Sequence, residues 1–190
     1  MKYLFLLLFL STSLMAKDYK STFSYEDFFK AKSAINFMRF DMESTKFGMV
    51  TTAFHGVVKK INLSYKLKKN VVSHAIISFK AVDLDTDVNG RNKKMHDLCF
   101  TKDKYPDIIV TLNAPIKVGT TQKSIPATMN IRGQNKDIKI IIDVIKKGKK
   151  LIVTGLSQTG LKELSIPDPS IWVAKVKNKI EIKFNFELDL

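Results

Sequence analysis

The chain has 190 residues, of which 45% are hydrophobic and 26% charged, and its 32 basic and 18 acidic residues give a net charge of +14. A chain of this length buries roughly 70% of its unfolded surface, so it needs no disulfide or metal to fold, and the single cysteine, Cys99, excludes an intrachain disulfide. A basic excess suggests nucleic acid as a partner, but the N-terminus indicates export and so argues against that class.

Residues 1–16 have the layout of a secretory signal peptide. Lys2 provides the basic start, residues 4–10 are all apolar, and Ala16 is a small residue at the expected cleavage point. Leu14 is larger than the residue usual at its position, so a cleavage site one to three residues earlier is left open. The apolar run is too short to span a bilayer as a helix, and no later stretch approaches the roughly 18 apolar residues needed. We therefore expect export across the inner membrane, with one mature domain of residues 17–190.

The mature chain begins with a candidate helix and continues mainly as strands. Residues 25–32 predict a short helix, with Ser24 as the candidate N-cap and Phe28 and Phe29 as its apolar contribution. Beyond it, apolar and polar residues alternate with a period of two, the pattern of strands with one buried face. The expected strands lie, in chain order, near residues 35–40, 51–58, 61–67, 71–80, 107–118, 125–132, 136–145, 150–158 and 180–188.

One segment breaks this alternation. In residues 88–100, Met95, Leu98 and Cys99 fall at helical spacing, which predicts a short helix across one end of the sheet. The links between strands are of hairpin length, so neighbouring strands should be antiparallel. About eight strands with one apolar face each can form either a sandwich or a closed barrel.

An ordered set of motifs resembles the YceI-like family. Its central part is a strand end with Asp83 and Thr86, then Arg91 and Asn92 opening a helix, then Phe100 and the pair Tyr105-Pro106 before the next strand. The flanking parts are residues 35–40, Gly48, residues 54–56, residues 129–133 and Lys136. The chain departs from the family pattern at residues 32–33, 91–92, 95–96 and 164–169, which leaves the headgroup end of any ligand open.

This resemblance implies an all-β fold: an extended, lipocalin-like antiparallel barrel of about eight strands with one or two short helices. It also implies a periplasmic protein that holds an isoprenoid or fatty-acid-like amphiphile inside the barrel and needs no cofactor. A barrel of about eight strands has room for one slender ligand or for its own side chains. Burial of each ligand methylene contributes about 0.8 kcal/mol, so an apolar tail needs no catalytic group to bind.

Inward-facing apolar side chains are the candidate ligand contacts, although the same residues would also serve as ordinary core. They are Phe37, Phe40, Phe54, Met95, Phe100, Leu112, Met129, Phe184 and Phe186. Arg91 and Asn92 are candidates for a headgroup contact, because helix N-termini favour anions. In the alternative, Arg91 only ties down its loop through Asp85 or Asp87.

The sequence offers little for catalysis. His55, His74, His96 and Cys99 lack the spacing of a zinc site, and no nucleophile or phosphate-binding motif is present. We therefore expect a protein that is not an enzyme and has no metal. Its expected partner is an apolar lipid. The lysines lie at turns and on alternate strand positions, which favours a solvated face with protected sheet edges; attraction to an anionic membrane surface and a homodimer are left open. The alternative function is an interaction or stress-response protein of the same fold, with a solid core and a basic docking surface.

Overall fold

The computed structural model describes residues 16–190. The expected signal peptide therefore lies outside the described residues, except for Ala16. None of the helices in the described part is long and apolar enough to cross a membrane.

The chain forms many strands and a few short helices. The strands are β1 (Lys17–Ser24), β2 (Phe37–Lys46), β3 (Val50–Val58), β4 (Lys60–Lys68), β5 (Val71–Lys80), β6 (Leu84–Asp85), β7 (Asp107–Leu112), β8 (Ile116–Lys117), β9 (Thr120–Ile131), β10 (Gln134–Lys147), β11 (Lys150–Gly160), β12 (Ala174–Val176) and β13 (Lys179–Asp189). The helices are α1 (Phe28–Ser33), the 3-10 turn η1 (Ala81–Asp83), α2 (Asn89–Lys94) and the π-helix η2 (Met95–Phe100), which continues α2.

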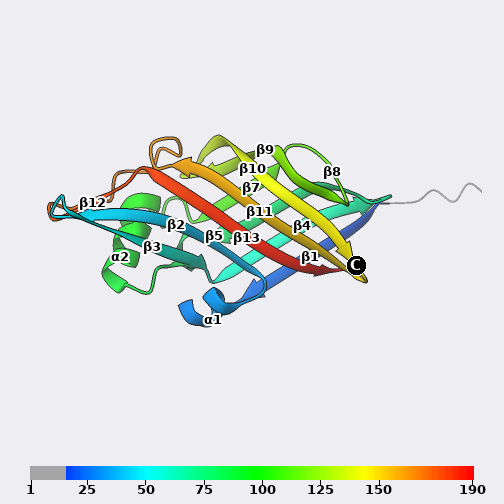
Figure 1. Cartoon of the computed structure of the whole chain (residues 1–190), viewed down its shortest axis with the longest axis horizontal. Coiled ribbons are helices and arrows are strands. Elements are labelled where there is room, and N and C mark those ends of the chain that lie inside the picture. Colours follow the sequence, from blue (N-terminus) through cyan, green and yellow to red (C-terminus); the bar gives the residue numbers. More distant parts are fainter. Residues whose placement is uncertain (1–15) are drawn as a thin grey trace, which may run out of the picture.

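The strands form one curled antiparallel sheet, a half-barrel that confirms the lipocalin-like fold (Figure 1). Its strand order is β1-β4-β5-β7-β9-β10-β11-β13-β2-β3-β6, with β12 added to β2 and β8 to β5. The two edges of the sheet meet at Lys59, whose carbonyl accepts the Tyr25 N–H at 2.8 Å and whose N–H donates to the Asp83 carbonyl at 2.8 Å. In Figure 1, the β2–β3 turn, β12 and α2 lie at one end of the molecule and the C-terminus at the other.

The period-two pattern explains the sheet. In β13 the side chains of Ile180, Phe184, Phe186 and Leu188 are at most 6% exposed, while their polar neighbours face outward. Tight turns with positive φ at both central residues connect several strands; at the β9–β10 turn these are Arg132 and Gly133. Such turns match the twist of a hairpin, so they keep consecutive strands antiparallel.

The structure differs from the sequence-based expectations in three places. It has 13 strands instead of about eight, partly because Pro115 interrupts the strand expected over residues 107–118. The strand β1, which the alternation did not reveal, pairs with β4. The first helix begins later than expected, because its N-cap is Asp27, whose carboxylate accepts the Lys30 N–H at 2.8 Å, and not Ser24.

The interior divides into two unlike halves. In the half near the C-terminus, apolar side chains from β4, β5, β10, β11 and β13 pack together and leave a gap of about 30 Å³. Phe186 in this half is fully buried, and its ring stacks on those of Phe23 and Phe184. In the half near α2 and β12 the same sheet encloses a much larger space, which is the candidate site.

Candidate functional site

A cavity of about 510 Å³ occupies the half of the barrel next to α2 and η2. This size is within the range of small-molecule sites, about 300–1,000 Å³. Its walls are apolar side chains from β2, β3, η2, β7, β9, β13 and the segment 161–173. The interior can therefore solvate a hydrocarbon chain but offers few partners to a polar molecule.

Methionine is unusually frequent in these walls. Met38 and Met42 of β2, Met95 of η2 and Met129 of β9 line the cavity, and each is at most 9% exposed. They are four of the seven methionines of the chain. Because methionine is unbranched and flexible, it packs well against irregular or variable apolar shapes.

Two aromatic rings shape the wall nearest the sheet edge. The ring of Phe40 lies directly over Gly56, its partner in the β2–β3 pairing, where a Cβ atom would overlap the ring. Glycine at position 56 therefore lets the ring lie flat along the wall. Phe54, two residues earlier on β3, also lines the cavity, and the guanidinium of Arg91 lies 4.5 Å from the centre of its ring.

The helical segment closes one side of the cavity and is fixed at its C-terminal end. The guanidinium of Arg132 donates to the carbonyls of Leu98 and Cys99 at 3.0 and 2.7 Å, so the β9–β10 turn holds the last turn of η2. His96 Nε2 lies 2.8 Å from the carbonyl oxygen of Leu84. These contacts place Met95, Cys99 and Phe100 in the cavity wall.

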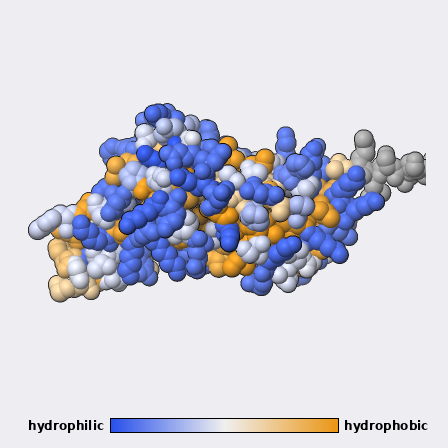
Figure 2. Space-filling view, turned by 90° about the horizontal axis from the view of Figure 1, so that it is seen from above, coloured by the Kyte–Doolittle hydropathy of each residue, from blue (hydrophilic) through white to orange (hydrophobic). Residues whose placement is uncertain are grey.

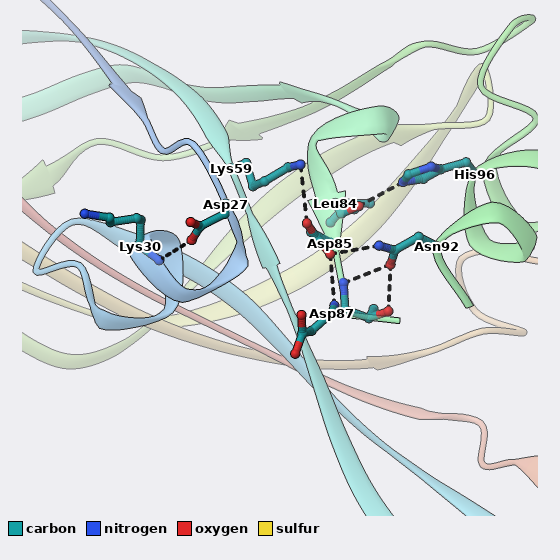
Figure 3. A network of polar contacts seen from close by, with 9 residues as sticks. Asp27, Lys30, Lys59, Leu84, Asp85, Asp87, Asn92 and His96 are labelled. Atoms are coloured by element: carbon teal, nitrogen blue, oxygen red, sulfur yellow. Dashed lines mark hydrogen bonds and ion pairs between the residues drawn. The ribbon is translucent and has the colours of Figure 1, made fainter. Parts of the chain in front are cut away.

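A polar network fixes the N-terminal end of α2 (Figure 3). The Asn92 side chain donates to the Asp85 carboxylate at 2.8 Å and accepts both the N–H and the hydroxyl of Thr86, at 2.9 and 2.6 Å. Burial alone would raise the pKa of Asp85, but hydrogen bonds from a backbone N–H, from Asn92 and from Lys59 outweigh burial and the pKa is lowered. Asp85 is thus a partly buried anchor for the start of α2.

The mouth of the cavity is basic. Arg91, Lys94 and Lys46 are among its lining residues, together with the exposed Val88, Gly90 and Ile171. Lys94 donates to the Ser170 carbonyl at 3.1 Å, and so connects α2 to the segment 161–173 on the opposite side of the mouth. The opening therefore lies between α2, the end of β2 and that segment.

Arg91 at this mouth has unused hydrogen-bonding capacity. One terminal nitrogen donates to the Thr86 carbonyl at 3.0 Å, while Nε is buried and has no partner among residues 16–190. Burial lowers the pKa of this guanidinium, and the charge of Asp87 acts in the opposite direction. Arg91 forms no ion pair with Asp85 or Asp87, which was the alternative to a headgroup contact; it is bound to its loop through the Thr86 carbonyl, and Asn92 and Lys59 contact Asp85.

The structure brings together only some of the predicted ligand contacts. Those that line the large cavity are Phe40, Phe54, Met95, Phe100, Met129 and Arg91. Leu112, Phe184 and Phe186 point into the solid half, because they lie farther along the barrel on the same inner face. Phe37 lines neither space, and its ring lies 5.5 Å from the guanidinium of Arg39. The Asn92 side chain forms hydrogen bonds with Asp85 and Thr86 and does not line the cavity.

Several cavity residues were not predicted. Met38 and Met42 flank Phe40 at spacings of two. Met38 lies within the strand expected over residues 35–40 and was not selected, and Met42 would have been found had that strand been extended. Leu161, Leu164 and Ile166 also line the cavity and are at most 8% exposed. They lie in a segment without helix or strand period, which carries no such signal.

The described residues hold no group of three or more His, Cys, Asp or Glu side chains that would suit a metal ion. His96 contacts a backbone carbonyl, and His55 stacks on Phe28 at 5.5 Å between ring centres. Burial raises the pKa of Cys99 to about 11, so its thiol is neutral and a poor nucleophile.

Comparison with known proteins agrees with this geometry. The YceI-like domain family matches residues 23–188. A search of curated proteins by sequence finds no match.

Similar solved structures share the fold at low sequence identity. BcnA from Burkholderia cenocepacia superposes with a TM-score of 0.64 at 13% identity, over 79% of this chain and 95% of that chain. A polyisoprenoid binding domain from Saccharophagus degradans, implicated in plant cell wall breakdown, gives 0.55 at 13% identity, over 80% and 93%. The YceI protein of Campylobacter jejuni gives 0.51 at 17% identity, over 69% and 84%.

Proposed function

Because the chain belongs to the YceI-like family, we propose that it binds one long-chain apolar amphiphile, of the isoprenoid or fatty-acid type, in the cavity and transports it without chemical change. The observation that carries this proposal is the cavity of about 510 Å³ with its methionine-rich apolar walls. A related domain of the same fold is a polyisoprenoid binding domain, which supports the same class of ligand here.

The mouth suggests how the ligand is oriented. An apolar tail gains free energy from burial in the cavity, whereas a polar headgroup keeps its hydrogen bonds only near the opening. There the guanidinium of Arg91 lines the cavity, donates to the Thr86 carbonyl through one terminal nitrogen, and brings a positive charge that favours a carboxylate or phosphate headgroup. A tail-inward orientation satisfies both ends.

The alternative function requires a solid core. In this half of the barrel a cavity of about 510 Å³ separates the walls, which argues against it. We place the function in the periplasm. The support for this location is the signal-like sequence of residues 1–16, and N-terminal sequencing of the protein from the periplasmic fraction tests it.

The test of binding is mass spectrometry of an organic extract from protein purified from its native host. We expect a stoichiometric apolar amphiphile. Met95→Trp fills the cavity and should abolish the bound lipid, while Leu98→Trp, on the exposed side of the same helical segment, should retain it. Extracts without lipid from the unmodified protein, or equal lipid in both variants with both folded by circular dichroism, would refute the proposal.

A further inference from the structure

The end of the molecule at the cavity mouth exposes a cluster of large apolar side chains, here called the apolar tip. Its residues are Phe47, Met49 and Val50 of the β2–β3 turn and Ile171 and Trp172 before β12, with exposures of 70, 83, 59, 50 and 94%. Figure 2 shows a pale orange patch at the end of the molecule where Figure 1 places these two turns.

Hydrogen bonds hold the two turns of the apolar tip together. Met49 N–H donates to the Lys46 carbonyl at 3.0 Å, and Ile171 and Ala174 exchange two backbone hydrogen bonds of 2.9 and 3.0 Å. Phe47 N–H donates to the Val173 carbonyl at 2.9 Å and joins one turn to the other. The side chains are therefore displayed outward from an ordered framework.

Phe47 is costly for the fold at this position. Its φ is +50°, in the left-handed region that asparagine, aspartate and glycine tolerate and bulky residues rarely adopt. Burial does not compensate for the strain, because the side chain is 70% exposed. The hydrogen bond of its backbone N–H to Val173 would be available to any residue, so the exposed phenyl ring adds nothing that offsets the strain, and a contact of the ring with a partner would do so.

The surroundings of the apolar tip are basic. Lys46 and Lys175 are exposed and form no ion pair with any residue in the range 16–190. Lys94 lies at the adjacent mouth. Of the nearby carboxylates, Glu43 is paired with Lys177 and Asp168 lies in the field of Lys175 and Lys94. The local charge is thus positive, like that of the whole chain.

We propose that the apolar tip docks on the surface of an anionic lipid bilayer, with Trp172, Phe47 and Met49 in the interfacial layer and Lys46 and Lys175 against acidic headgroups. Tryptophan favours the membrane–water interface, where its ring is buried and its N–H stays hydrated. Lysines near an anionic surface add attraction that falls with salt. Since Lys46 and Ile171 also line the cavity mouth, docking would bring the opening to the lipid; this role deepens the proposed function and rests on it.

The single tryptophan of the chain is Trp172, so its fluorescence reports on the apolar tip alone. We expect a blue shift and protection from aqueous quenchers with vesicles of mixed phosphatidylcholine and phosphatidylglycerol, less with phosphatidylcholine alone, and less at high salt. Replacing both Lys46 and Lys175 by glutamine should weaken vesicle binding roughly 30-fold, at about fivefold per lysine. The matched control replaces Lys147 and Lys149, at the β10–β11 turn near the opposite end, and should bind normally.

A second variant separates docking from folding. Phe47→Asn suits the left-handed backbone, so it should raise the free energy of unfolding and at the same time weaken vesicle binding. No fluorescence change with anionic vesicles, equal losses in the two lysine pairs, or unchanged binding by Phe47→Asn would overturn the proposal. A blue shift that rises with protein concentration without vesicles would overturn it in favour of a second copy of the chain. Lipid retained in organic extracts of the tip variants leaves the cargo function standing whatever the vesicles show.

Discussion

Two glycines provide a matched test of the hollow and solid halves of the barrel. Gly56 and Gly155 each face an aromatic ring of the paired strand, Phe40 and Phe184, and a Cβ atom at either position would overlap that ring. Neither glycine has a positive φ, so alanine fits the backbone at both. The two substitutions thus apply the same push to a ring beside the cavity and to a ring in a packed core.

The expected loss in free energy of unfolding differs between the two variants, because the displaced ring has empty space beside it in one and not in the other. Overpacking a core costs about 1–3 kcal/mol. Phe184 is 5% exposed and stacks on Phe186 at 5.3 Å, so Gly155→Ala should lie near the upper limit. Phe40 can turn into the cavity, so Gly56→Ala should cost about 1 kcal/mol, although its Cβ would also be 3.1 Å from the Asp85 carbonyl oxygen. The loss of unfolded-state freedom is similar at both glycines and cancels in the comparison.

Urea denaturation of the two variants measures this difference, which should be about 2 kcal/mol, or roughly 4–8 °C in Tm. The displaced Phe40 ring should also reduce lipid retention in Gly56→Ala, while Gly155→Ala, once folded, should retain lipid normally. Equal destabilisation by both variants, or unaltered lipid binding by Gly56→Ala, would show that Phe40 has no empty space beside it and would refute the cavity argument.

Three further predictions follow from the polar groups around the cavity. Thr86 is 3% exposed, and Asn92→Ala removes the acceptor of its N–H and of its hydroxyl. The free energy of unfolding in urea should therefore fall by about 2–4 kcal/mol. An unchanged midpoint would contradict the role of this network. Hydrogen bonds from two lysines lower the pKa of Asp97 from 3.8 to about 2, so its stabilising contribution is complete above pH 3.8 and disappears as the pH falls toward 2. Asp97→Asn should therefore flatten the acid dependence of Tm in that window, and a parallel curve would contradict the assignment. Because burial raises the pKa of Cys99 to about 11, its thiol should react slowly with Ellman's reagent in the native protein and quickly in urea; fast native reaction would show that the cavity wall opens.

The sequence predicted the inner face of the barrel better than its contents. The alternation in β13 correctly placed Phe184 and Phe186 inside, but an inward residue looks the same whether it borders a cavity or a packed core. The distinction depends on where the helical segment and residues 161–173 hold the walls apart, and neither has the strand period. Gly56 is a similar case, since its role is visible only once Phe40 is seen to lie on it.

Sequence patterns failed to predict features that depend on contacts between distant segments. For Arg91 the sequence left a headgroup contact and a pairing with a nearby aspartate open. In the structure Asn92 contacts Asp85, and the Arg91 guanidinium lies over the ring of Phe54. The strand β1 was missed because only Tyr19 and Phe23 give it an apolar face; it is held by pairing with β4, which no short stretch of sequence encodes.

The filled half of the barrel also limits how the proposed ligand would enter and leave. Because the far end is packed, a chain-like ligand that enters at the mouth beside α2 would go in end-first and leave along the same route. The end that enters last would also be the first to leave, and an acceptor would meet that end first. The side chains around the mouth would then control the rate of ligand exchange. The packed aromatic side chains at the far end of the cavity would limit the length of ligand that fits.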